Sequence, residues 1–540
     1  MTELFPERAT PGSNLRAAFG LTSVPLADLV ILTAVMALAA VLRLWHVTQP
    51  LVDVFSWREA STAMMSDNFR TGGWNILFPE VSWTGPGPSY QGREFQLFSY
   101  AVAILQALFG WHDWFGRGLA MLFGMVTVFS LHRMTALIWD ERHAHAAALC
   151  YALLPAAVMI DTSYLPDPAM LALVTLGVWM YLRYWLFGAR AVLVIATVSF
   201  TLGVLSKLPG LGAGLVIAML AVALAKAGHL RLALHTVIAV AASLTAIVAW
   251  YAWAIYLGTH YPPFHVAGSG YVWDLGLAEF MANAFFFPSL WNLSVWWFYG
   301  YPFLALLVIG LWKIPTHDEF GKEPALTLVP LIWLVAGVLI YLLAAKEISS
   351  NPWNLHMMHV PVAMFCGRAV VRLIGQGGDS LRSIRGALRM VLMLVAMTGF
   401  ATLPLVARMK DPQAEEARLL GQELQRLMSP ADLIITVAPE VGDPIAVYYS
   451  RGRGWVFPPG GGNADWSTFG NDGPEAIAVL EDLHAQGAVW FGVAKNAKDS
   501  QGRLFTEHHP ALIAHLDATA TKVADTSVFL IYRLKAPTAP

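Results

Sequence analysis

Long apolar stretches recur through most of the chain and constrain its fold more than any other feature. The hydrocarbon core of a membrane is about 30 Å thick, so a helix that crosses it needs about 20 apolar residues. Stretches that approach this length are residues 27–47, 115–137, 143–160, 168–187, 190–206, 210–226, 233–257, 300–313, 326–345, 358–375 and 388–408. The sequence therefore predicts a polytopic α-helical membrane protein with about eleven transmembrane helices.

The composition supports this class and excludes others. Only 13% of the residues are charged, whereas about 25% are charged in a soluble globular protein. The 34 basic and 36 acidic residues nearly cancel, so the chain lacks the basic field that nucleic-acid binding requires. Cys150 and Cys366 stand in apolar runs, which is typical of small buried side chains rather than of disulfides or metal ligands. The first apolar stretch is too long and too poorly flanked for a cleaved signal peptide.

The lysines and arginines of the short loops indicate which side of the membrane each loop faces, because cytoplasmic loops are rich in them. A cytoplasmic N-terminus places most of these residues inside, and the opposite orientation would place nearly all of them outside. The residues concerned are Arg133, Arg142, Arg183, Arg190, Lys226, Arg231, Lys313, Lys322, Arg368, Arg372, Arg382, Arg385 and Arg389. We therefore expect residues 1–26 to be cytoplasmic.

Three large segments then lie outside: residues 48–114, residues 258–299 and everything after about residue 409. We expect residues 27–409 to form the transmembrane domain, with 48–114 as its large outer loop, and residues 410–540 to form a soluble α/β domain. Residues 96–111 are short for a membrane span and suit a helix that lies along the membrane surface.

The C-terminal residues show the short strands and amphipathic helices that are typical of an α/β domain. We predict helices over 413–428 and 474–486, and strands over 433–437, 489–493 and 527–534. The sequence PPGGGN at 458–463 does not stand between a strand and a helix as nucleotide-binding loops do. We therefore interpret it as a connecting loop.

Ionisable residues are concentrated in the first outer loop, although charge is rare in the chain. This loop contains Asp53, Arg58, Glu59, Asp67, Arg70, Glu80, Arg93 and Glu94, among Trp57, Trp74, Trp83 and Tyr90. An aromatic belt at the membrane interface explains the tryptophans. It does not explain several carboxylates in a loop of over sixty residues, and these indicate a functional site.

Further polar residues stand at the predicted outer ends of later helices. Asp161 and Asp167 bracket a turn, and Asp167 alone is also explained as the cap of the next helix. Lys207 and Lys346 stand before two other outer helix ends. A lysine that extends its amine to the membrane surface is a common arrangement. Two lysines on the outer, lysine-poor side nevertheless favour an anionic ligand, and a phosphate is the obvious candidate.

Histidines after the seventh apolar stretch raise the question of a metal. His260 and His265, with Glu94 from the first loop, offer ligands for a divalent cation, although their spacing matches no metal-binding motif. The sequence identifies no certain cofactor and leaves a divalent cation open. If a divalent cation binds, Glu94 and His265 are the residues that we expect to hold it.

The polar patches occur in an order that resembles the membrane glycosyltransferases of the GT-C type, in particular a bacterial branch related to protein O-mannosyltransferases and to the lipid A aminoarabinose transferase. The resemblance rests on Asp53 and on SWREASTAMMSDNF (56–69), GREFQLFSYAVAILQALFG (92–110), FGRGLAMLFG (115–124), SYLPDPAML (163–171) and LSKLPG (205–210). It covers residues 25–210 well and is weaker beyond them.

The resemblance implies roles for individual residues. Asp53 matches the first-loop aspartate that is the family's expected catalytic residue, and Asp167 matches the second-loop aspartate. Glu94 matches an acidic residue that binds metal in some relatives. Arg117 matches the arginine that opens the second span, and Lys207 matches the lysine before the sixth.

Two departures from the family pattern concern the first loop. Asp53 is followed by Val54, where many relatives have a second acidic residue. Glu94 is followed by Phe-Gln, where metal-binding relatives tend to have a lysine and prolines. The resemblance therefore leaves metal use open, and Arg58 or Arg93 can supply the contacts to phosphate instead.

The activity that the resemblance implies is the inverting transfer of a sugar from a polyprenyl-phosphate donor to a cell-envelope acceptor, on the periplasmic face of a bacterial inner membrane. Asp53 would accept the proton of an acceptor hydroxyl. Cationic side chains would stabilise the departing phosphate, and the candidates are Arg58, Arg93, Arg117, Lys207 and Lys346. The sugar stays open, and so does the acceptor, which can be a glycan, a lipid or a protein.

Two other classes of protein also stay open. One is a noncatalytic membrane assembly protein that uses its C-terminal domain for interaction. The other is a transporter or flippase for lipid-linked glycans, which should carry charged or broken helices near the middle of the membrane. The predicted polar groups stand at outer helix ends instead, which favours the transferase.

Overall fold

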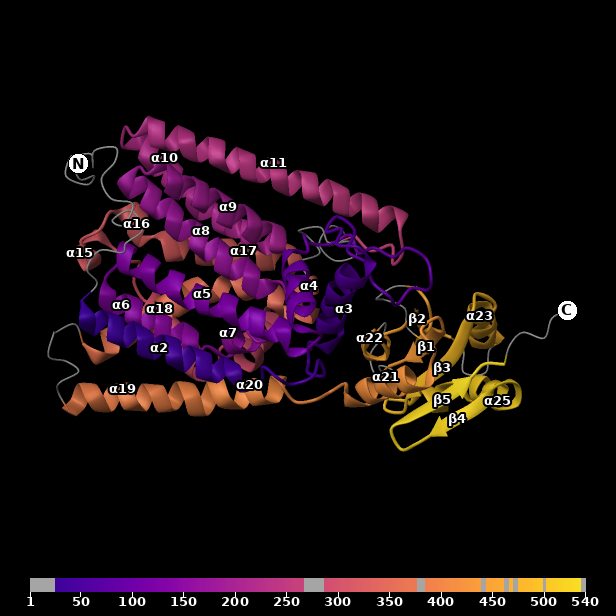
Figure 1. Cartoon of the computed structure of the whole chain (residues 1–540). Helices are drawn as coiled ribbons and strands as arrows, with labels where there is room; N and C mark the ends of the chain where they lie inside the picture. Colours follow the sequence, from indigo (N-terminus) through magenta and orange to yellow (C-terminus); the bar gives the residue numbers. More distant parts are fainter. Residues whose placement is uncertain are drawn as a thin grey trace. The chain divides into compact units, whose positions relative to one another are not determined.

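The structure, a computed structural model, describes residues 25–266, 286–375, 384–438, 443–460, 466–469, 474–498 and 502–535. The chain divides into two compact units (Figure 1). Unit 1 comprises residues 1–48, 117–250 and 268–410, and unit 2 comprises residues 49–116, 251–267 and 411–540. The first outer loop and the C-terminal residues therefore belong to the same unit.

Unit 1 consists of helices that lie alongside one another (Figure 1). Its α-helices are α2 (Leu26–Leu44), α5 (Trp114–Ile138), α6 (Glu141–Leu153), α7 (Pro155–Ile160), α8 (Asp167–Phe187), α9 (Arg190–Ser206), α10 (Gly214–Lys226), α11 (Leu230–His260), α13 (Phe286–Leu293), α14 (Gly300–Leu311), α15 (His317–Phe320), α16 (Pro324–Thr327), α17 (Val329–Ser350), α18 (His359–Ile374), α19 (Ile384–Met397) and α20 (Leu403–Met409). Short 3₁₀ or π segments are η1 (Leu208–Ala213), η2 (Ser294–Phe298), η3 (Pro352–Met358) and η4 (Thr398–Thr402). Residues 114–116 of α5 and 251–260 of α11 are assigned to unit 2.

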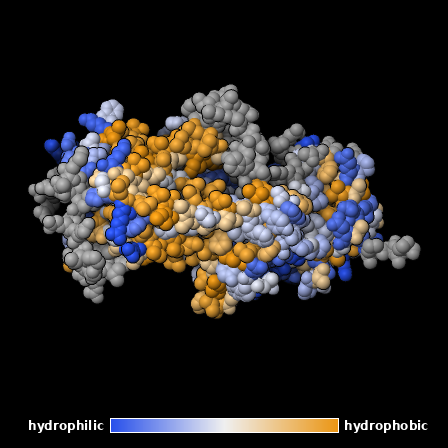
Figure 2. Space-filling view, turned by 90° about the horizontal axis from the view of Figure 1, so that it is seen from above, coloured by the Kyte–Doolittle hydropathy of each residue, from blue (hydrophilic) through white to orange (hydrophobic). Residues whose placement is uncertain are grey.

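Each of the predicted apolar stretches coincides with helical structure, which confirms the polytopic helical fold. Within the described ranges, seven helical segments are long and apolar enough to cross a membrane, or up to eight if a bent pair is one span. That pair, Pro288–Phe298 and Gly300–Leu311, is bent by 112°. The stretch 143–160 is broken between α6 and α7, because Pro155 cannot donate a helical hydrogen bond. Hydrophobic side chains cover much of the surface of these helices (Figure 2).

Helix α18 lies in the interior of unit 1 and packs closely against its neighbours. A Cβ atom on Gly367 would lie 2.5 Å from the Ala147 nitrogen of α6, and one on Gly310 of α14 would lie 2.0 Å from the Phe365 oxygen of α18. Glycine at these positions lets the backbones approach, as is common between helices in membranes. The same packing holds the N-terminal end of α18 beside the polar residues described below.

Unit 2 contains a sheet, its covering helices and the folded first loop. The helices are α3 (Ser56–Gly72), α4 (Leu97–Phe109), α21 (Glu415–Leu427), α22 (Ile445–Ser450), η5 (Trp466–Thr468), α23 (Pro474–Ala485), α24 (Phe505–His508) and α25 (Pro510–Thr519). The strands are β1 (Leu433–Val437), β2 (Arg453–Val456), β3 (Ala488–Ala494), β4 (Thr521–Asp525) and β5 (Phe529–Arg533).

The described strands form one mixed sheet in the order β2-β1-β3-β5-β4. Strand β1 is parallel to β2 and β3, and β5 is antiparallel to β3 and β4. Helix α21 packs on one face, where Leu420 and Leu424 contact Gly492, and its buried positions recur at helical spacing. The hydrophobic core lies on the other face, under α23 and α25. The predicted small C-terminal α/β fold is confirmed, although the sequence pattern does not predict β2 and β4.

The first loop completes the sheet on the open side of β2. The Gly85 N–H donates to the Gly454 oxygen (2.7 Å), and the Gly454 N–H donates to the Ser82 oxygen (3.0 Å). Gly85 has a φ of +102°, and a Cβ atom there would lie 2.7 Å from Nε1 of Trp455. Only glycine fits this backbone conformation and this contact without displacement. The loop and the C-terminal residues thus fold together as one body.

Candidate functional site

Asp53 lies in the short connection that leads into α3 and is fully buried. Its Oδ1 accepts a hydrogen bond from the Phe55 N–H (2.9 Å), and its backbone oxygen accepts one from the Ser56 N–H (2.9 Å). An Asp side chain that accepts a hydrogen bond from the backbone two residues later forms a tight turn. The turn fixes the orientation of the carboxylate.

The backbone before Asp53 is held by C-terminal residues of the same unit. The Val52 oxygen accepts hydrogen bonds from the N–H groups of Gln413 (2.6 Å) and Ala414 (3.1 Å). The Leu51 N–H donates to the Tyr449 hydroxyl (2.9 Å), across 398 residues of sequence. The C-terminal domain therefore positions the predicted catalytic aspartate, a role that the sequence does not reveal because the partners are so far apart in the chain.

Four predicted site residues come together in unit 2. The Arg58 guanidinium donates to the Glu94 carboxylate, and both side chains are buried. Arg93 lies 5.8 Å from the centre of the Trp57 ring, a cation–π arrangement. The pKa of His265 is lowered to about 3 by the positive charge of Arg93, by burial and by the positive charge of Arg58. The negative charge of Glu94 raises this pKa by a smaller amount. The potential at His265 is therefore positive, and this histidine is neutral at pH 7.

The charges around His265 bear on the ligand that this cluster can bind. Glu94 is already engaged by Arg58, and the two guanidinium groups outweigh its charge at His265. The guanidinium groups of Arg58 and Arg93 suit an anion such as a phosphate. Glu94 and His265 stay the residues that we predict to hold a divalent cation if one binds, and we assign no step to a metal here.

The lowered pKa of His265 predicts a pH-dependent stability. Between pH 6.5 and about 3, the unfolded chain binds a proton at this histidine that the folded chain does not, so the folded state loses stability as the pH falls below 6.5. We expect His265→Gln to raise the free energy of unfolding by about 2 kcal/mol at pH 5 and to leave it unchanged at pH 8. Melting curves of both proteins at the two pH values check this. The same effect at both values would contradict it.

Unit 1 contains a buried network around Asp161. The Arg43 Nε and Nη2 atoms donate to Asp161 Oδ2 at 3.0 and 2.7 Å. His356 Nε2 lies 3.2 Å from Asp161 Oδ1, and the Tyr151 hydroxyl lies 3.4 Å from the same oxygen. His356 Nδ1 lies 2.9 Å from His359 Nδ1. Arg43, Asp161 and both histidines are fully buried, so this network joins α2, α7, η3 and α18.

Two further cations reach the residues after Asp161. Arg117 Nη1 donates to the Thr162 oxygen at 3.0 Å, and Lys410 Nζ lies 3.3 Å from the same oxygen and 3.4 Å from the Ser163 hydroxyl. Both cations are buried. The resemblance predicts Arg117 as a contact to phosphate. Nothing in the sequence singles out Lys410, because it stands where the apolar pattern of the last span ends.

Asp167 and Lys207 form a buried ion pair, with Lys207 Nζ 3.0 Å from Asp167 Oδ2. Asp167 begins α8, but no side-chain capping hydrogen bond is present at the start of that helix. The interpretation of Asp167 as a helix cap is therefore wrong. Lys207 also lies 5.8 Å from the centre of the Trp353 ring. Lys346 belongs to α17, and its side chain lies outside the described residues.

These buried charges share one end of the helices of unit 1. They stand at the ends of α2, α7, α9 and α20 and at the starts of α5, α8 and η3. Among the side chains named here, the cations are Arg43, Arg117, Lys207 and Lys410, and the carboxylates are Asp161 and Asp167. Cations outnumber carboxylates two to one. The predicted residues of unit 1 thus come together at this end of the helices, although their functional roles stay predictions.

Comparison with known proteins identifies related families. Residues 96–256 match the family of dolichyl-phosphate-mannose-protein mannosyltransferases. The structure of ArnT from Cupriavidus metallidurans in the apo state is similar to this chain with a TM-score of 0.62 and 15% identity, over 97% of this chain and 100% of that one. The structure of the same protein bound to undecaprenyl phosphate gives 0.61 and 14%, over 96% and 100%.

A second group of similar structures is archaeal. The oligosaccharyltransferase AglB from Archaeoglobus fulgidus, in complex with an inhibitory peptide and a dolichol-phosphate, has a TM-score of 0.60 and 13% identity, over 95% of this chain and 75% of that one. A structure of an oligosaccharyltransferase from Archaeoglobus fulgidus in complex with Zn and sulfate has a TM-score of 0.58 and 14% identity, over 86% of this chain and 68% of that one. No curated protein matches the chain by sequence.

Proposed function

Because the chain has the GT-C type fold and is related to the protein mannosyltransferases and to ArnT, we propose that it is an inverting glycosyltransferase. Its donor is a sugar carried on a polyprenyl phosphate, and its acceptor belongs to the cell envelope. The reaction takes place on the outer, periplasmic face of a bacterial inner membrane.

The observation that carries this proposal is the group of buried charged side chains at one end of the helices of unit 1. In unit 1, Arg117 and Lys410 both reach the residues that follow Asp161. In unit 2, Arg58 and Arg93 outweigh Glu94 in their effect on His265. Lysine and arginine side chains form strong, charge-assisted hydrogen bonds to phosphate oxygens. ArnT and AglB have structures with lipid phosphates bound.

The proposed chemistry follows from the residue types. The cations stabilise the negative charge that develops on the donor phosphate as the glycosidic bond breaks. Asp53 takes the proton from the acceptor hydroxyl while that oxygen attacks the anomeric carbon from the face opposite the phosphate. The bond to the phosphate oxygen breaks, and the configuration of the sugar inverts. Asp167 acts through Lys207, which it holds in place by the 3.0 Å ion pair.

The location of the buried charges argues against the transporter. The charges described above gather at one end of the helices of unit 1, whereas a transporter places its substrate site near the middle of the membrane. An assembly protein would have no need for this concentration of buried charge. Both classes remain outcomes of the experiment that follows.

The proposal is tested by turnover of radiolabelled polyprenyl-phosphate sugars by the purified full-length chain, with an envelope extract as the acceptor. We expect release of the sugar from at least one donor and its appearance in the extract. Movement of intact donor across vesicle membranes without cleavage would instead identify a transporter. Neither cleavage nor movement, with a monodisperse protein and every donor of the panel, would contradict the proposed function.

Loss of a single cation is expected to weaken donor binding. Arg93→Gln and Lys410→Gln each remove one charge from the proposed phosphate contacts, and a hydrogen bond to a charged group contributes about 1.5–3 kcal/mol. We expect the Kd for undecaprenyl phosphate to rise about 10- to 100-fold in each variant. Lys498→Gln is the matched control, because Lys498 is exposed in the C-terminal domain. An unchanged Kd in both variants would remove these residues from the donor site.

A further inference from the structure

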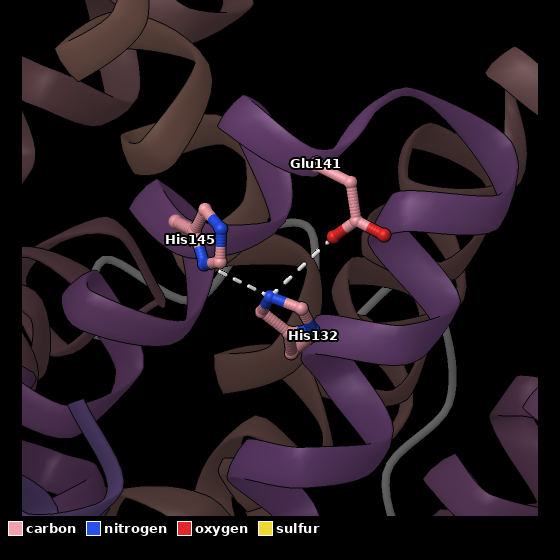
Figure 3. A group of neighbouring side chains, drawn as sticks. All are labelled: His132, Glu141 and His145. Carbon is pink, nitrogen blue, oxygen red and sulfur yellow. Dashed lines mark hydrogen bonds and ion pairs between the residues drawn. The ribbon is translucent and has the colours of Figure 1, made fainter. Parts of the chain in front are cut away.

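Three potential metal ligands meet at the other end of α5 and α6. His132 stands near the end of α5, and Glu141 and His145 stand in the first two turns of α6 (Figure 3). One ligand atom from each of the three lies within 4.8 Å of the others. Arg117 stands at the start of α5, and the helix between it and His132 is about 22 Å long at about 1.5 Å per residue. The cluster is therefore separate from the proposed transferase site.

The hydrogen bonds of His145 orient its ring for coordination. His145 Nε2 lies 3.0 Å from Asp28 Oδ1, and its Nδ1 lies 3.0 Å from His132 Nε2. A carboxylate that accepts the proton of one ring nitrogen leaves the other nitrogen with a free electron pair, which is the usual arrangement behind a metal-bound histidine. Asp28 thus turns the Nδ1 electron pair of His145 toward His132 and Glu141.

Glu141 contributes an oxygen that is not otherwise used. Its Oε1 lies 3.4 Å from the Arg133 guanidinium. Its Oε2 is buried and has no hydrogen-bond partner among the described residues, and it lies 3.7 Å from His132 Nε2. The Glu141 side chain as a whole is 39% exposed, and this oxygen is available as a metal ligand.

Two of the three separations between ligand atoms are close to those around a tetrahedral ion, and the third is at most 4.8 Å. Zinc lies about 2.0–2.1 Å from histidine nitrogens, so neighbouring ligand atoms are about 3.3 Å apart. The separations of 3.0 and 3.7 Å from His132 Nε2 are close to this value. Coordination requires that Nε2 of His132 be unprotonated, with the proton on Nδ1. Two imidazoles and one carboxylate form a set that zinc binds with water in the fourth position.

We propose that His132, Glu141 and His145 form a zinc site that ties α5 to α6, with Asp28 of α2 orienting His145. The expected orientation of the chain puts this end of the helices on the cytoplasmic side. The site takes no part in the proposed sugar transfer, so the test of the zinc site does not depend on whether the proposed function is correct.

The test is the zinc content of the full-length protein in detergent, after removal of metal with a chelator and re-equilibration with Zn²⁺ alone. We expect about one zinc ion per chain in the wild type and its loss in Glu141→Gln and in His145→Gln. Glu141→Gln keeps an oxygen that can accept from Arg133, so it is the variant that should fold if His145→Gln does not. Zinc should also raise the Tm of the wild type and not that of Glu141→Gln.

Two further variants locate the ion. His317→Gln removes an exposed histidine of α15 and should leave the zinc content unchanged. Glu94→Gln should also leave it unchanged, because Glu94 belongs to the other candidate cluster. Zinc that is lost in Glu94→Gln and kept in Glu141→Gln would overturn the proposal. Equal zinc in the wild type, Glu141→Gln and His145→Gln would also overturn it and identify a hydrogen-bonded histidine pair.

Discussion

Asp53→Asn is expected to lower the rate of sugar transfer by about 10²- to 10⁴-fold, which is the usual contribution of a general base. Asparagine has nearly the same shape as aspartate, and its side-chain oxygen can still accept the hydrogen bond from the Phe55 N–H. The turn before α3 is therefore preserved while the proton acceptor is lost. The measurement is single-turnover transfer from a donor that the wild type uses.

The control for this variant is Glu80→Gln, which removes another carboxylate of the same loop. Glu80 pairs with Arg453 at 2.6 Å, and glutamine keeps an oxygen that can accept from it. We expect near-normal transfer in Glu80→Gln. If Asp53→Asn were as active as this control, Asp53 would not be the base.

Asp161→Asn is expected to lower the free energy of unfolding by about 3–5 kcal/mol, because it leaves the buried Arg43 guanidinium without its charged partner. Both side chains are fully buried, so water cannot replace the lost interaction. The loss is measured as a shift in unfolding by denaturing detergent, with the wild type unfolded in parallel.

Two further variants show whether the loss of stability in Asp161→Asn comes from the buried charge. Glu423→Gln breaks an ion pair with Arg426, whose side chain is 77% exposed, and exposed pairs contribute about 1 kcal/mol or less. The double variant Arg43→Met and Asp161→Asn should recover much of the stability, because it removes the buried cation as well. A loss in Asp161→Asn no larger than that in Glu423→Gln would show that the network is not important for stability.

The elements of the fold were predictable wherever one local pattern determines them. The predicted strand 433–437 coincides with β1 (Leu433–Val437), since a short run of β-branched residues between polar segments is specific. Strand β2 has only four residues and contains Gly454, so its sequence has no strand pattern. Strand β4 is mostly exposed and lacks the alternation of a half-buried strand. Both form because neighbouring strands pair with them.

The residues of the candidate site were predictable, but most of their partners were not. Charges in the first loop stand out against an apolar chain, and Arg58, Arg93 and Glu94 do come together. Asp161, in contrast, pairs with Arg43 at a distance of 118 residues in sequence. The only local signal for Arg43 is a charge inside the first apolar stretch, where an ionisable residue usually has a function or a partner.

The pairing of residues 82–85 with β2 bears on how the C-terminal domain behaves when separated from the chain. A strand with unpaired backbone groups on one side is an edge strand, and such edges promote aggregation between chains. On the opposite side of the sheet, β4 carries Lys522 and Asp525, charges that discourage such pairing. The backbone groups at the edge of β2 are instead hydrogen-bonded to residues 82–85 of the first loop. A fragment that contains only residues 411–540 would expose that edge, and we expect it to self-associate.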